Sequence, residues 1–96
     1  MTEDEIKNWM RIYAVEILAV NSFAVFCLKE APDDPLALSA KAHQRMIDTV
    51  RRRGFPGVDP AMSDHASAEL EDAVNRLMEM ASAQIREALE GRKAKT

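Results

Sequence analysis

The stretch IYAVEILAVNSFAVFCL, residues 12–28, decides the fold of this chain. Fourteen of its seventeen residues are apolar, and the exceptions are Glu16, Asn21 and Ser22. A membrane-spanning helix needs about 20 largely apolar residues, and a carboxylate at its centre costs a few kcal/mol. We therefore expect the central helix of a soluble protein, with no membrane partner.

The composition predicts one globular domain over residues 1–96. Apolar residues make up 47% and charged residues 30%, which is ordinary for a folded protein, while few glycines and aromatic residues favour helices over strands. The net charge of −3 argues against nucleic-acid binding. The acidic start MTEDEIKNW is unlike a secretory signal, so a cytoplasmic location is expected.

Two segments rich in proline and glycine divide the chain, KEAPDDPL and RRRGFPGVDPAMSD. They predict an all-α fold with three helices at about 2–30, 35–53 and 60–90, packed as an antiparallel bundle. Thr2, Asp34 and Asp59 are suited to cap the three helix starts, with Ser63 as the alternative cap of the third. Gly54 and Gly91 are expected to end the second and third helices, which leaves residues 91–96 as a frayed basic tail.

The first helix carries apolar residues on two faces. One seam, spaced by fours and threes, is suited to pack on another helix; it contains Ile6, Met10, Tyr13, Ile17, Val20, Ala24 and Cys27. A second seam, on a different face, contains Ala14, Leu18, Asn21 and Val25, with Ser22 beside it.

The second and third helices each carry one apolar stripe. These are Leu36, Ala40, His43, Ile47 and Val50 with Met46, and Leu70, Val74, Leu77, Ala81, Ile85 and Ala88 with Met78 and Leu89. Two one-sided helices cannot enclose a helix that is apolar all round. The sequence therefore predicts a homodimer through the long first helix, with Ala14, Leu18, Asn21, Ser22 and Val25 at the interface.

Glu16 has three open interpretations. It is a solvated group at a bundle edge, a buried ion pair with Arg45, His43 or Arg76, or part of a binding or catalytic pocket with Tyr13 and His43. A fourth interpretation, a buried carboxylate without a partner, is excluded by the high free-energy cost of burying an unpaired charge.

Other polar residues give weaker indications. His43, His65, Glu16 and Asp64 lack the spacing of a metal motif, so we expect no metal and no cofactor, and Cys27 is expected to be a small buried hydrophobe. Arg51, Arg52 and Arg53 form a basic patch that complements the helix dipole. Phosphate or an acidic partner is the alternative ligand of this patch.

The leading function is a small non-enzymatic interaction or regulatory protein that acts as a helical homodimer and has itself, and possibly another protein, as partner. Two alternatives stay open: a nucleic-acid-associated accessory protein that uses Arg51–Arg53, and a small-molecule or enzymatic pocket around Glu16 and His43. No catalytic motif favours an enzyme.

Overall fold

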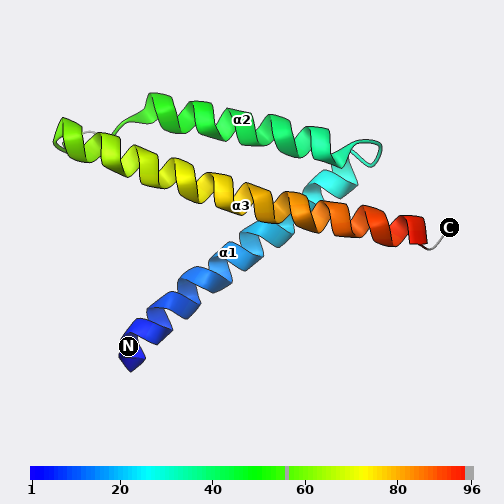
Figure 1. Ribbon diagram of the computed structural model, residues 1–96, viewed down its shortest axis with the longest axis horizontal. Coiled ribbons are helices and arrows are strands. Elements are labelled where there is room, and N and C mark those ends of the chain that lie inside the picture. Colours follow the sequence, from blue (N-terminus) through cyan, green and yellow to red (C-terminus); the bar gives the residue numbers. More distant parts are fainter. Residues whose placement is uncertain (56, 95–96) are drawn as a thin grey trace.

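A computed structural model describes residues 1–55 and 57–94 of the chain. It contains three α-helices: α1 (Glu3–Glu30), α2 (Pro35–Arg53) and α3 (Pro60–Ala94), shown in Figure 1. The described residues contain no strand, so the prediction of an all-helical chain is confirmed.

The three helix starts are fixed by local hydrogen bonds. Thr2 Oγ1 accepts from the Glu5 backbone N–H at 3.2 Å. An Asp34 oxygen accepts from the Ala37 N–H at 3.1 Å, and an Asp59 oxygen from the Ala61 N–H at 2.9 Å. Each bond satisfies a donor that the first turn leaves unpaired. The predicted caps are therefore confirmed.

The predicted helix ends are correct for α1 and α2 and wrong for α3. Gly54 ends α2 with φ at 60°, a backbone conformation that favours glycine. Helix α3 instead continues through Gly91 to Ala94. A glycine inside a helix costs only about 1 kcal/mol relative to alanine, so it does not end a helix by itself. Residues 95 and 96 of the predicted frayed tail lie outside the described residues.

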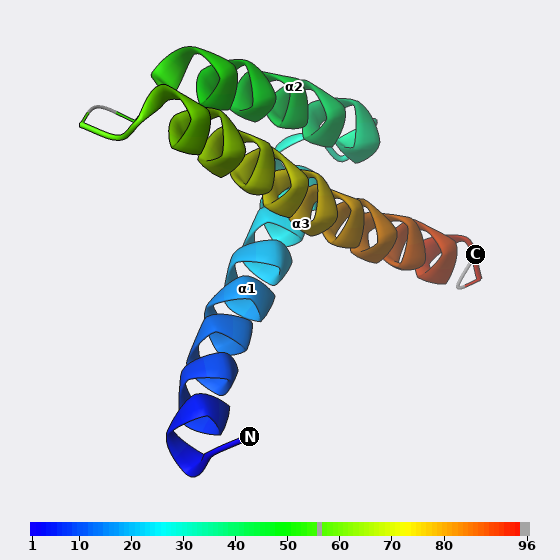
Figure 2. The same ribbon diagram turned by 60° about the vertical axis from the view of Figure 1, so that its left-hand side comes forward.

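Helices α2 and α3 form an antiparallel hairpin, and α1 crosses α3 obliquely (Figures 1 and 2). The core lies at this crossing, where Ala24 and Cys27 of α1 pack with Ile85 of α3. Leu36 and Leu38 of α2 close it from one side. Only the second half of α1 therefore takes part in the core.

One position of the α2 stripe differs from the prediction. Ala40 is exposed, and its neighbour Ser39 is 1% exposed instead. The Ser39 hydroxyl lies 3.5 Å from the Ser82 hydroxyl of α3. Two small hydroxyl residues thus meet where α2 and α3 pack, and each gives the other a hydrogen-bond partner.

The single chain is open rather than compact. Its radius of gyration is 16.5 Å, whereas about 12.5 Å is expected for a compact domain of this length. Its dimensions are 55 × 37 × 15 Å. The shortest dimension is therefore less than the combined diameter of two helices packed side by side.

Candidate interaction surface

Helix α1 divides at Glu16 into a bare half and a packed half. Every residue from Glu3 to Val15 is exposed, and Glu16 is the first that is partly covered. We call residues 3–15 the arm. Figure 2 shows it projecting from the hairpin. Beyond it, Val20, Ala24 and Cys27 are buried.

The first predicted seam is buried only in its second half. Ile6, Met10, Tyr13 and Ile17 were expected to pack on another helix, and all four are exposed. The reason is geometric, because α1 diverges from the hairpin on the N-terminal side of the crossing (Figure 1). Trp9 and Ile12 broaden the same face, and Trp9 is 58% exposed. The arm thus presents a large apolar face that continues the core-facing side of α1.

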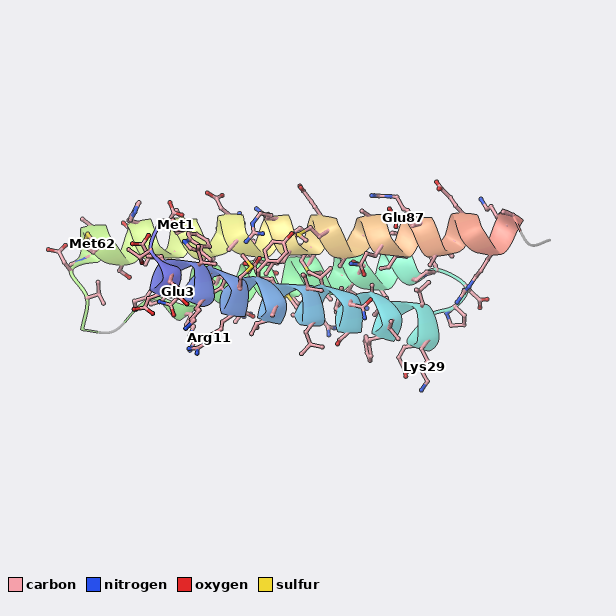
Figure 3. All side chains as sticks on the ribbon, turned by 90° about the horizontal axis from the view of Figure 1, so that it is seen from below. Met1, Glu3, Arg11, Lys29, Met62 and Glu87 are labelled. Atoms are coloured by element: carbon pink, nitrogen blue, oxygen red, sulfur yellow. The ribbon has the colours of Figure 1, made fainter. Side chains whose placement is uncertain are left out.

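The second predicted seam, which we call the outer seam, lies on the other side of α1. Its residues are Ala14, Leu18, Asn21, Ser22 and Val25, and all five are exposed. Arg11 and Lys29 flank it and point away from α3 (Figure 3). Leu18 follows Trp9 by nine residues, which is two and a half turns, so the two side chains occupy opposite faces of α1.

An apolar hollow lies beside the crossing. Its lining comes from all three helices: Ala19, Val20, Phe23, Met46, Val74, Leu77, Met78 and Ala81. Its volume is about 150 Å³. An apolar cavity of that order holds a benzene-sized group, whereas pockets for drug-sized ligands begin at about 300 Å³. The hollow therefore suits one large side chain better than a metabolite.

An ion pair lies where the arm leaves the hairpin. Arg76 of α3 donates to both oxygens of Glu16, at 2.8 and 3.3 Å. These hydrogen bonds, together with the charge of Arg76, lower the pKa of the Glu16 carboxyl. The Glu16 side chain is 20% exposed. Glu16 thus forms an ion pair with Arg76, at a partly exposed position rather than the buried one of the second interpretation, since the Arg76 side chain is 53% exposed.

His43 belongs to a different cluster. Its Nε2 lies 2.6 Å from Oδ1 of Asn75. A polar hollow of about 300 Å³ is lined by both residues together with Arg51 and Glu71. Among the described residues no hydrogen bond joins His43 to Glu16 or to Tyr13, and neither of these two residues lines the hollow beside His43. Asn75 and Glu71 were not foreseen, since each contacts a residue at least 20 positions away.

The basic patch is spread around the end of α2. Arg51 forms an ion pair with Glu71 at 2.7 Å, which raises the pKa of Arg51. Arg52 donates to the backbone carbonyl of Asp48 at 3.2 Å. Two of the three guanidinium groups therefore already have partners within the hairpin.

The remaining candidate groups form no site. No cluster of three potential metal ligands occurs in residues 1–55 and 57–94. Cys27 is a free, fully buried thiol, and burial raises its pKa. Among the helices of the described residues, α1 alone is long and apolar enough to cross a membrane, by length and composition only.

Comparison with protein-family models, with curated proteins and with solved structures found no match to this chain.

Proposed function

We propose that this chain is a small non-enzymatic interaction or regulatory protein of the cytoplasm that acts as a homodimer through α1. The observation that carries the proposal is the surface that one chain leaves uncovered. Most of the large apolar side chains of α1 are exposed. Contiguous apolar surface of this extent is typical of a protein–protein contact.

The amount of surface supports a partner of substantial size. The accessible surface of one chain is 7373 Å², whereas a compact monomer of 10.7 kDa exposes about 5,500 Å². The excess is about 1,900 Å² per chain, and a standard interface covers about 800 Å² per partner. A second copy supplies matching apolar area, and two-fold pairing is the commonest form of association.

The outer seam gives the contact that we propose between the two copies. Ala14 and Ser22 are small enough for close approach of two helices. Leu18 is 67% exposed and Val25 53% exposed, and no other helix of the chain covers them. Asn21 can pair with its symmetry mate and fix the register, as a single polar residue does in coiled coils. Lys7, Arg11 and Lys29 lie near the ends of this face, and so outside the dry centre of an antiparallel crossing.

Sedimentation equilibrium at micromolar concentration tests the proposal. The wild type is expected to sediment above the 10.7 kDa of one chain. Leu18→Glu places two carboxylates in the contact and is expected to weaken association at the outer seam. Ala83→Glu is the matched control, because Ala83 is also exposed but lies on α3. A well-folded wild-type monomer at all concentrations would sink the proposal.

A further inference from the structure

We infer that the arm of one copy docks on the apolar hollow of another copy, through the face of α1 opposite Leu18. The inference rests on the proposed self-association and adds a second contact surface to it. A partner that covers Leu18 leaves Trp9 in solvent, since the two side chains lie on opposite faces. The apolar face of the arm therefore needs a cover of its own.

The arm cannot reach the hollow of its own chain. Helix α1 has no glycine or proline between Glu3 and Glu30, so nothing in its sequence allows a sharp bend. Its 28 residues span about 42 Å. The bonds between Arg76 and Glu16 hold the base of the arm beside α3. The arm and the hollow of one chain are thus held apart. A two-fold axis between two chains places the arm of each copy on the hollow of the other.

Size and shape make Trp9 the residue that enters the hollow. It lies near the middle of the arm's apolar face, with Ile12 and Tyr13 beside it. An aromatic ring fits a hollow of about 150 Å³. Tryptophan is also among the residues that most often anchor protein interfaces.

Charge complementarity gives the orientation of the docked arm. Met46 lines the hollow, and Arg53 follows it by two turns on the same side of α2. The acidic residues Glu3, Asp4 and Glu5 precede Trp9 by one to two turns. An arm antiparallel to α2 therefore places its acidic end beside Arg53, which forms no ion pair among the described residues. The positive end of the arm's dipole then meets the negative end of α2.

The uncovered surface is sufficient for both contacts. An excess of about 1,900 Å² per chain allows two interfaces of about 800 Å² each. The outer seam and the arm contact, each with its own two-fold axis, close into a tetramer when the two axes intersect at right angles, and this is the assembly that we infer.

The tryptophan itself is the probe, because Trp9 is the only one in the chain. Fluorescence and sedimentation are followed over a dilution series of the full chain. As the tetramer forms, emission is expected to shift to shorter wavelength and acrylamide quenching to fall. Leu18→Glu should retain this shift and sediment as a dimer of about 21 kDa. Met46→Glu should still associate through the outer seam, but its Trp9 should remain accessible to acrylamide and show no emission shift.

Ile12→Glu on the arm should repeat the result of Met46→Glu, and Ala83→Glu should behave as the wild type. Circular dichroism checks that each variant is folded. Association of the wild type without a change in Trp9 emission overturns the arm contact and leaves the proposed outer seam intact. Loss of the Trp9 shift in Leu18→Glu also overturns it. A shift on addition of phosphatidylcholine vesicles, and not on concentration, assigns the arm to lipid instead. A monomer at every concentration contradicts both proposals.

Discussion

Arg76 donates two hydrogen bonds to the carboxylate of Glu16 across 60 residues of sequence, at 2.8 and 3.3 Å. Glu16 is also the last residue, counted from the packed end of α1, that the rest of the chain partly covers. The pair therefore ties α1 to α3 at the point where the two helices separate.

Glu16→Gln is expected to lower the thermal stability at neutral pH, because the variant loses the charge-assisted hydrogen bonds from Arg76. The pKa of the Glu16 carboxyl in the folded chain lies below its ordinary value of 4.5. The stabilisation is therefore fully present above about pH 4.5 and is lost as the pH falls through the lower folded-state pKa. Melting curves recorded from pH 3 to pH 7, in steps of about one pH unit, measure this loss of stability.

Glu87→Gln is the control for that experiment, since Glu87 is an exposed carboxylate on the same helix as Arg76. The difference between wild type and Glu16→Gln should shrink in acid, while Glu87→Gln should follow the wild type throughout. A Glu16→Gln curve that matches the wild type at neutral pH would show that the ion pair contributes nothing to stability.

Ile85→Ala is expected to destabilise the chain by about 2–5 kcal/mol, the usual cost of such a truncation in a core. Ile85 is completely buried against Ala24 and Cys27, so the lost side chain leaves a cavity between α1 and α3. Urea unfolding measures the change. Val58→Ala, in an exposed loop position, should stay within about 0.5 kcal/mol. Equal effects of the two substitutions would place the core elsewhere.

Asp34→Ala is expected to cost about 1 kcal/mol, because the Ala37 N–H loses its acceptor at the start of α2. The adjacent Asp33 provides a control of the same charge, as it is exposed and does not cap the helix. Denaturant unfolding of both alanine variants separates the capping bond from a general charge effect. A larger loss for Asp33→Ala would contradict the assignment of Asp34 as the cap.

The basic end of α2 is expected not to retain duplex DNA at physiological salt. Arg51 is held by Glu71, Arg52 is bonded to a backbone carbonyl, and the chain carries a net charge of −3. Few phosphates could be neutralised at once, and salt weakens such contacts steeply. A gel-shift or anisotropy titration measures the affinity. Submicromolar binding that disappears in a triple Arg51, Arg52 and Arg53 to alanine variant would reverse this conclusion.

The sequence predicts well what is set within one turn of the chain. Thr2, Asp34 and Asp59 cap the helices as their side-chain chemistry indicates. The prediction that Gly91 ends α3 is wrong, because a glycine lowers helix stability only a little and does not by itself turn the backbone out of the helix. Helix ends that lack proline or a turn are therefore poorly marked in sequence.

The partners of polar and apolar faces are harder to predict. Periodicity correctly marked Val20, Ala24 and Cys27 as core, yet it gave the same marking to Ile6 and Met10, which are exposed. A period states which face is apolar and does not state what lies against it. The partner of Glu16 was one of three candidates until the crossing of α1 and α3 placed Arg76 beside it, for the choice depends on an angle between helices rather than on spacing.

The order of synthesis gives the core a consequence for the newly made chain. Cys27 packs with Ile85, which the ribosome adds 58 residues later. Translation at about 5–20 residues per second leaves the most apolar segment of the protein without its packing partner for about 3–12 seconds. Faster arrival of α3, rather than a stronger α1, is what would shorten the exposure.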